Sequence, residues 1–240
     1  ANHPIYNHPL PEGHRFPMLK YELLPKQLLH EGTAECTDFY SPDSIDLSLV
    51  HAVHTVSYVK ALTELTLDAK AVRSIGFPLS AALVERELRI AQGTVVGCNH
   101  ALENGIAFNI AGGTHHAFST RGEAFCLLND QAIAAQYLIN QKKCHKILIV
   151  DLDVHQGNGT AEIFQNNADV ITFSMHGQSN YPFRKETSDY DIALPDKTDD
   201  TTYLSILQET LPELLNIHRP DFVFYLAGVD ILGTDKLGKL

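Results

Sequence analysis

Carboxylate and imidazole side chains end an apolar run in the segment KILIVDLDVHQGNG. The run Lys146–Val150 predicts a buried strand, and Asp151, Asp153 and His155 follow it at alternate positions. Alternate residues on an extended backbone point to the same side, so these three side chains can share one direction. The Gly-Asn-Gly sequence that comes next predicts a turn that contains Asn158.

A further acidic residue, Asp230, ends a second apolar segment, FVFYLAGVD. Burying several carboxylates together is unfavourable unless a cation or protons neutralise them. Two carboxylates and one imidazole with an open coordination position are typical of a catalytic Zn²⁺ site, and Fe²⁺ or Mn²⁺ would accept the same donors. The alternative is that the acids only cap helices and bind loop N–H groups. Their occurrence after two separate strands favours a metal site.

Two adjacent histidines, His115 and His116, lie in the segment IAGGTHHAF. Packing does not require a histidine pair on a Gly-Gly turn, although one of the two could be a hydrogen-bonded core residue. Histidine is the side chain best suited to proton transfer near neutral pH. Beside a metal that polarises a carbonyl and binds water, the pair would supply a base and a proton shuttle.

The elements that would position these residues alternate between strand and helix patterns. Two further apolar runs of strand length, Val170–Met175 and Asp221–Leu226, are separated by the helical pattern TTYLSILQETLPELLNI. Strands that are apolar throughout and alternate with helices indicate a parallel sheet covered on both faces. Ligands collect at the carboxyl ends of such strands, where Asp151–His155, Ser174–His176 and Asp230 all fall.

Helical patterns predominate before the first of these strands. Short helices are expected in KYELLPKQLLHEG and HTVSYVKALTEL. In SAALVERELRIAQG the apolar residues recur at helix spacing, and Gly93 marks the expected end. The segment LNDQAIAAQYLINQ predicts a helix with Asn129 or Asp130 as its N-cap.

Length and composition are those of an ordinary globular domain. The 240 residues are 44% hydrophobic and 20% charged. The net charge of −11 argues against broad electrostatic binding to nucleic acid or to an anionic membrane. The four cysteines are scattered without a Cys-x-x-Cys pair, and no apolar run reaches the roughly 20 residues that a membrane helix needs. These features predict a cytoplasmic protein.

Taken together, the motifs resemble those of the histone deacetylase family, zinc hydrolases with the arginase/deacetylase fold. The resemblance runs from HPLPEGHRFPM to AGVDILGTDKLG and includes GGTHHA, GEAFCLLND and DLDVHQGNGT. The form DLDVHQGNG, with Gln156 and Asn158, is most like the class IV branch and its bacterial relatives. The resemblance implies one catalytic domain over residues 1–240, with a three-layer α/β/α fold around a mostly parallel sheet. It also implies hydrolysis of the amide of N-acetyl- or N-acyl-lysine, or of a related acylated amine.

The family pattern implies two cation sites in this chain. The zinc ligands would be Asp153, His155 and Asp230. The second would be a structural potassium site. Its ligands here would be Asp151, Asp153, His155, Ser174 and the carbonyl of Met175.

The same pattern makes His115 and His116 the catalytic histidines, with Asp151 orienting the first of them. His116 would take the proton of the attacking water and return it to the lysine amine. Behind His116, where many family members have an aspartate, this chain has Asn158. An amide oxygen can accept the imidazole N–H but brings no negative charge, so we expect imidazolium at His116 to be less stabilised.

Four residues match the substrate channel of the family. Phe125 matches one wall of a narrow acyl-lysine channel, and Tyr181 is the candidate for the other wall. Leu237 matches an apolar residue at the rim, and Arg15 matches an arginine near the exit cavity for acetate.

One departure from the family concerns the tyrosine that polarises the substrate carbonyl. In the family it lies in a Gly-Gly-Tyr-type turn after the last zinc ligand, and no such turn follows Asp230 before Leu240. We therefore expect that the C-terminal part of the catalytic domain is missing from this sequence. Without that tyrosine the rate of amide hydrolysis would fall by about 10²–10³-fold.

Other interpretations of the same residues stay open. The substrate could be an acetylated polyamine instead of an acyl-lysine peptide or protein. A Mn²⁺ ureohydrolase of arginase type shares the fold but would need more aspartates for a second metal. A non-catalytic homologue that binds metal or acyl-lysine is the third possibility. Neither nucleic acid nor membrane is an expected partner.

Overall fold

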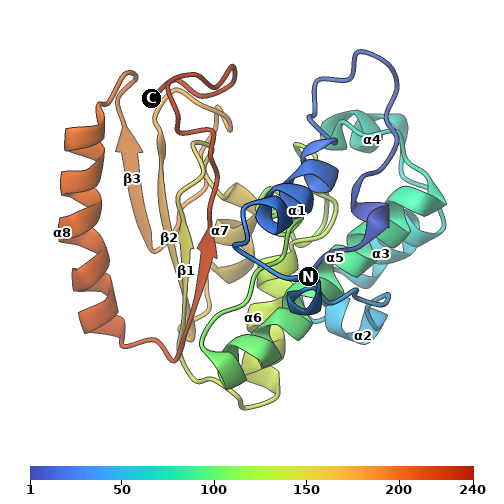
Figure 1. The fold of residues 1–240 in the computed structure, drawn as a ribbon, viewed down its shortest axis with the longest axis horizontal. Coiled ribbons are helices and arrows are strands. Elements are labelled where there is room, and N and C mark those ends of the chain that lie inside the picture. Colours follow the sequence, from blue (N-terminus) through green and yellow to red (C-terminus); the bar gives the residue numbers. More distant parts are fainter. The chain divides into compact units, whose positions relative to one another are not determined.

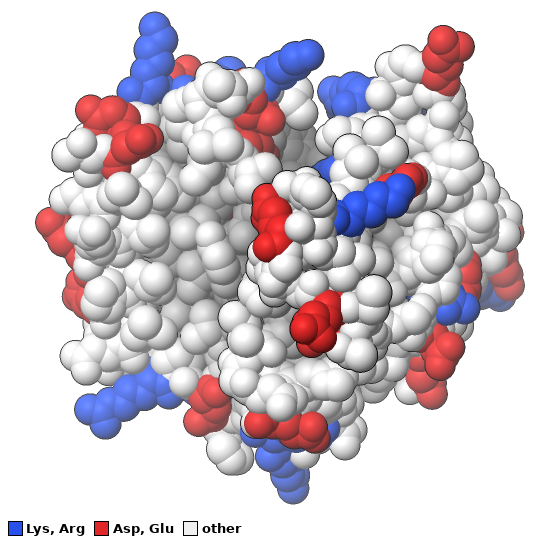
Figure 2. Space-filling view, viewed as in Figure 1, with Lys and Arg blue, Asp and Glu red and all other residues white.

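The computed structural model describes residues 1–240, which form two compact units, Ala1–Tyr137 and Leu138–Leu240 (Figure 1). The first unit is helical and the second is built on a β-sheet. None of the helices combines the length and the hydropathy needed to cross a lipid bilayer. On the face drawn in Figure 2, basic and acidic side chains are interspersed. The expectation of one domain over residues 1–240 stays a prediction.

Four parallel strands form the sheet of the second unit, in the order β3-β2-β1-β4. Asp151, the last residue of β1, lies opposite Ser174 in β2 and Leu226 in β4. Parallel pairing therefore brings the carboxyl ends of β1 and β4 to the same edge of the sheet, as the sequence predicts. The strand bounds are Ile147–Asp151 for β1, Val170–Gly177 for β2, Tyr190–Leu194 for β3 and Phe222–Leu226 for β4.

Strand β2 is longer than the sequence pattern indicates, and β3 is missing from the prediction. The strand was expected over Val170–Met175, with Ser174–His176 at its carboxyl end, but β2 continues to Gly177. The second half of β2 pairs with β3, whose residues alternate between more and less exposed positions. A short strand at the edge of a sheet, buried only in part, gives little hydrophobic signal.

Helix α8, Asp200–His218, covers one face of the sheet (Figure 1). The predicted helix is confirmed, and its apolar side chains at helix spacing pack onto a core built largely from β1 and β2. The helix begins after Asp199, whose carboxylate accepts a hydrogen bond from the Thr202 N–H. The apolar side chains at helix spacing are Tyr203, Ile206, Leu207, Leu211 and Leu214.

Helix α7, Asn158–Phe164, follows the polar loop after β1 and contacts β2. Asn158 is the first residue of this helix, so the prediction that it lies in a turn was wrong. The Ala161 N–H donates to the Gly157 carbonyl, which makes Gly157 the N-cap. A glycine before a helix and a glycine in a turn have the same local signature.

Six α-helices begin in the first unit, and α6 continues into the second. The helices expected near residues 20, 56 and 130 are confirmed. Asn129 caps α6, because its Oδ1 accepts a hydrogen bond of 3.0 Å from the Ala132 N–H. The bounds are α1 Lys20–His30, α2 Leu47–Val50, α3 Val56–Thr63, α4 Ala69–Ile75, α5 Ala81–Asn104 and α6 Asp130–Asn140, with short 3₁₀ turns at Pro4–Tyr6 and Cys36–Asp38.

Helix α5 passes through Gly93, where the sequence pattern predicted its end. Gly93 is buried, and a Cβ at this position would lie 2.8 Å from the Tyr6 hydroxyl oxygen and 3.0 Å from the Ala1 Cβ. The glycine therefore permits close packing of the N-terminal segment and does not end the helix. The helix ends instead at Gly105, which has a positive φ of 90°.

His54 is a buried structural histidine of the first unit, only 1% exposed. Its Nδ1 lies 2.9 Å from the Phe118 carbonyl, which can only accept, so Nδ1 donates. Its Nε2 accepts a hydrogen bond of 3.0 Å from the Asn129 N–H. A proton on Nε2 would point at the Asn129 N–H, so two donors would face each other in a buried position. Burial accordingly lowers the pKa of His54 from 6.5 to about 4.

We expect His54 to make the stability of the protein depend on pH. Because the folded pKa lies below the unfolded one, His54 contributes stability that is complete above pH 6.5 and is lost as the pH falls towards 4. The expected loss is about 3 kcal/mol in the free energy of unfolding. Denaturant unfolding at several pH values should show that the free energy of unfolding depends less on pH in His54→Gln than in wild type. Equal dependence would contradict the prediction, and His51→Gln, at an exposed histidine, is the control.

Candidate metal centre and histidine pair

Three predicted metal ligands meet at the carboxyl end of the sheet in the second unit. Donor atoms of Asp153, His155 and Asp230 all lie within 4.8 Å of one another. His155 Nδ1 is 3.0 Å from Asp153 Oδ1 and 3.0 Å from Asp230 Oδ2. The three side chains are 16–21% exposed. The cluster therefore offers two carboxylates and one imidazole that a small ion can reach.

Hydrogen bonds to the loop after β1 hold these side chains in place. The chain leaves the extended conformation after Asp151, whose Oδ1 accepts from the Asp153 N–H at 3.1 Å. Asp153 Oδ1 accepts from the His155 N–H at 2.8 Å, and Asp230 Oδ1 accepts from the Val154 N–H at 3.0 Å. Turns, and not a continuing strand, bring the donors together. The two interpretations of the acids are compatible, because the same carboxylates bind loop N–H groups and face one imidazole.

The donor set fits a tetrahedral metal ion. Zn²⁺ with bonds of about 2.0–2.1 Å places neighbouring donors roughly 3.3 Å apart, close to the 3.0 Å found around His155. Gly228 allows the segment after β4 to approach the β1 loop, because a Cβ there would lie 2.6 Å from the Asp153 Cα. That approach brings Asp230 to the cluster.

The carboxylates favour positive charge at this position. Burial by itself lowers the pKa of His155, but hydrogen bonds and charges from Asp153 and Asp230 raise it to about 9. A cation among the three side chains would be stabilised by the same two charges. Metal binding at His155 requires its neutral form, so bound metal and the proton on Nδ1 exclude each other.

Asp151 and Ser174 are buried neighbours on β1 and β2, and both belong to the predicted potassium site. Ser174 Oγ is 3.0 Å from His176 Nδ1 within the same strand. Burial lowers the pKa of His176 to about 4, so the imidazole is neutral near pH 7. The Met175 side chain packs into the core under α8, which leaves only its carbonyl as a potential ligand.

The histidine pair lies in the first unit, in the loop between α5 and α6. His115 and His116 are each 5% exposed, and their ring centroids are 4.0 Å apart. The His115 N–H donates to the Gly113 carbonyl, and Gly113 has a φ of 91°, which favours glycine. The predicted support of His115 by Asp151 links residues of different units and stays a prediction.

Two of the predicted channel residues lie together in the first unit. The Arg15 guanidinium carbon is 5.0 Å from the centroid of the Phe125 ring. Phe16 and Phe77 also contact Phe125, with ring centroids 5.0 and 5.1 Å away. Phe125 has a positive φ of 69°, a conformation that is rare for a large side chain. Its N–H donates to the Ile75 carbonyl, which holds the strained backbone in place.

The other two predicted channel residues belong to neighbouring segments of the second unit. Asn180, next to Tyr181, donates from Nδ2 to the Leu237 carbonyl at 2.8 Å. The Leu237 side chain is 55% exposed. The Asn180 bond thus joins the segments of Tyr181 and Leu237, and their roles in the channel stay a prediction.

Comparison with known proteins decides the family. The model of the histone deacetylase domain matches residues 14–240. This chain belongs to the histone deacetylase family. The match includes all the residues proposed from the sequence for metal binding and catalysis.

Relatives of this histone deacetylase family member include bacterial and plant proteins. An uncharacterised protein of Picosynechococcus sp. is 49% identical over 238 residues, which cover 99% of this chain and 79% of that protein. Histone deacetylase 2 of Arabidopsis thaliana is 29% identical, and the match covers 95% of this chain and 61% of the plant protein. This chain thus spans less than two thirds of that named relative.

A solved structure confirms the expected fold. The crystal structure of a histone deacetylase homologue in complex with SAHA superposes with a TM-score of 0.83 at 25% identity, covering 96% of this chain and 68% of that chain. The three-layer α/β/α fold of arginase/deacetylase type, with its mostly parallel sheet, is therefore confirmed.

Two buried side chains that hold the site loops of this deacetylase family member are not found by sequence patterns. Asp130, 1% exposed, accepts hydrogen bonds from the Gly113 N–H at 3.0 Å and from the Thr114 N–H at 2.8 Å. It also accepts from the hydroxyls of Thr114 and Thr94, so it fixes the turn before His115. The second is Gln156, which the sequence marks only by its resemblance to one branch of the family. Their partners are distant in the sequence, so local spacing gives no signal.

Proposed function

We propose that this protein is a zinc-dependent deacetylase that hydrolyses the amide of N-acetyl- or N-acyl-lysine, or of a related acylated amine. The cluster of Asp153, His155 and Asp230, in a chain of the histone deacetylase family, carries the proposal. The lysine substrate would be part of a peptide or protein. Because a homologue of the same fold was crystallised with SAHA, SAHA is a suitable probe for binding here.

The bound metal would polarise the acyl carbonyl and lower the pKa of a water molecule. His116 would accept a proton from the attacking water and return it to the leaving lysine amine, with His115 assisting. In this proposal Asp151 would accept the outer N–H of His115 and Asn158 would accept that of His116, which would fix both tautomers. Asn158 carries no charge, and it therefore stabilises imidazolium less than an aspartate would.

Further roles follow for the remaining predicted residues. A potassium ion would use the buried pair of Asp151 and Ser174, together with Asp153, His155 and the Met175 carbonyl. Phe125 and Tyr181 would form the walls of the acyl-lysine channel, with Leu237 at its rim. Arg15 would line the exit cavity beside Phe125, in keeping with its position over that ring.

The direct test is release of acetate by the purified protein. We expect acetate from an Nε-acetyl-lysine peptide when Zn²⁺ is present, loss of activity after chelation, and recovery when Zn²⁺ is added back. An acetylated polyamine assayed in parallel distinguishes the amine substrate from the peptide, since the net charge of −11 would also suit a cationic amine. Tight SAHA binding without acetate release from any substrate would contradict the proposal and favour a non-catalytic homologue.

A further inference from the structure

Gln156 connects the metal centre to a long loop of the second unit. It follows His155 in the sequence and is only 1% exposed. Its Nε2 donates to the Glu186 carbonyl at 2.8 Å, and its Oε1 accepts from the Glu186 N–H at 2.9 Å. The same Nε2 also donates to Asp191 Oδ1 at 2.8 Å. One buried side chain thus satisfies both backbone groups of a residue 30 positions away.

Only a side chain with a donor and an acceptor on one planar group can make this pair of bonds. Glutamate could accept from the Glu186 N–H but could not donate to its carbonyl, and methionine could do neither. Losing the amide would remove the bonds that Gln156 makes to the Glu186 N–H and carbonyl. The chemistry of Gln156, and not merely its size, therefore fixes Glu186.

The loop that Gln156 holds, Gln178–Asp189, joins β2 to β3 and contains Tyr181. Inside the loop, Lys185 Nζ donates to the carbonyls of Asn180 and Pro182 at 2.6 and 2.7 Å. Asn180 in turn donates to the Leu237 carbonyl. Gln156 thus holds Glu186, and the preceding residue, Lys185, bonds back to the segment of Tyr181, which Asn180 joins to the Leu237 segment.

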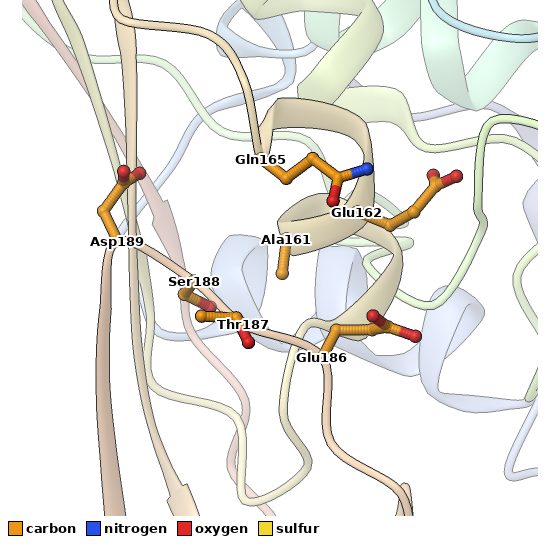
Figure 3. A pocket seen from close by; sticks show the side chains of 7 residues that line it. All are labelled: Ala161, Glu162, Gln165, Glu186, Thr187, Ser188 and Asp189. Atoms are coloured by element: carbon orange, nitrogen blue, oxygen red, sulfur yellow. The ribbon is translucent and has the colours of Figure 1, made fainter.

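The end of this loop lies beside α7. Glu186, Thr187, Ser188 and Asp189 line a cavity of about 330 Å³ together with Ala161 and Glu162 of α7 and the following Gln165. Figure 3 shows this loop segment passing beside α7. Asp189 is itself anchored to β2, since its Oδ2 accepts from the Thr172 N–H at 2.8 Å. Gln156 and Thr172 therefore both anchor the end of the loop, and the earlier part of the loop contains buried Asn180 as well as exposed residues. Phe183 in that part is 91% exposed.

We propose that Gln156 is a positioning residue that sets the Tyr181 wall and the rim of the substrate channel. This inference rests on the proposed function, in which Tyr181 and Leu237 contact an acyl-lysine substrate. Gln156 acts on the loop and not on the metal. Its loss weakens the binding of peptides that contact the rim and leaves the metal centre and the chemical step intact.

The first test measures the loop itself and needs no activity. Trypsin can cut after Arg184, which is exposed on the loop. We expect cleavage at this bond to be about tenfold faster in Gln156→Met than in wild type, because the anchoring bonds are lost. Gln131→Met is the matched control, since Gln131 is also buried but its Oε1 has no hydrogen-bond partner. Equal cleavage rates in all three proteins would overturn the proposal.

The second test separates binding from chemistry. For Gln156→Met we expect KM for an acetyl-lysine peptide to rise about tenfold, with kcat and bound zinc nearly unchanged. KM for free Nε-acetyl-lysine, which reaches less of the rim, should change less. A fall in kcat or in zinc content at unchanged KM would show that Gln156 supports the metal centre, contrary to the proposal. Gln156→Asn keeps an amide in the core but is too short for both bonds, and it repeats the test if Gln156→Met does not fold.

The two tests also separate this inference from the proposed function. If wild type deacetylates no substrate, the proposed function fails, while the trypsin measurement still decides whether Gln156 holds the loop. If wild type is active and cleavage after Arg184 does not change, the proposed function stands and the role of Gln156 is wrong.

Discussion

Replacing Asp153 by alanine is expected to empty the metal centre and to lower deacetylation by about 10³-fold or more. Asp153 Oδ1 is one of two carboxylate oxygens 3.0 Å from His155 Nδ1, so its loss removes one of three donors and half of the local negative charge. Metal ions supply several kcal/mol of transition-state stabilisation in hydrolases, and each 1.4 kcal/mol is about tenfold in rate. Bound zinc should fall from about one per chain to nearly zero after dialysis.

Alanine at Asp153 also removes the acceptor of the His155 N–H, so a second variant separates metal binding from loop structure. In Asp230→Asn, Oδ1 can still accept from the Val154 N–H, while the charge beside His155 is lost. We expect zinc affinity to fall in this variant with little change in Tm. Asp169→Ala, at an exposed aspartate of the same unit, should keep both zinc and activity. Full zinc occupancy with normal turnover in Asp153→Ala would refute the assignment of the ligands.

The cluster of Asp153, His155 and Asp230 could be predicted from the sequence because most of its signal is local. Asp151, Asp153 and His155 follow an apolar run in one short segment, and the parallel sheet that brings Asp230 to them is itself predicted by buried strands alternating with helices. The manner of assembly was different from the expectation, because the donors meet through turns instead of an extended strand. The types of residue at the end of a buried strand therefore predicted the site correctly, although the extended backbone expected after Asp151 was wrong.

The features that the sequence did not predict depend on contacts between distant residues. Gly93 has the local signature of a helix end, but its role is to admit the Tyr6 hydroxyl against α5. Asp130 was expected at most to cap a helix, and it instead binds a turn 16 residues earlier. Gln156 binds a residue 30 positions later. Propensity and periodicity describe neighbours along the chain, so they cannot reveal hydrogen bonds that only the folded structure creates.

Replacing His116 by glutamine is expected to lower kcat by about 10²–10⁴ and to leave the metal in place. Glutamine keeps a polar planar group of similar size in a buried position but cannot carry a proton between water and the leaving amine. His116 and His115 lie in the first unit, and neither is part of the cluster formed by Asp153, His155 and Asp230. Zinc content and SAHA affinity should therefore stay close to those of wild type.

Measuring kcat, zinc content, SAHA affinity and Tm together distinguishes loss of a catalytic base from damage to the loop. A catalytic base that is lost reduces kcat at constant zinc and constant SAHA affinity, whereas a damaged loop would weaken SAHA binding and lower Tm as well. Asp130→Ala provides that comparison, because it releases the turn before His115 without changing either imidazole. His51→Gln, at an exposed histidine of the same unit, controls for the substitution itself. If His116→Gln retains wild-type kcat, His116 is not the base, and proton transfer must be assigned to another group, with His115 the first to be tested.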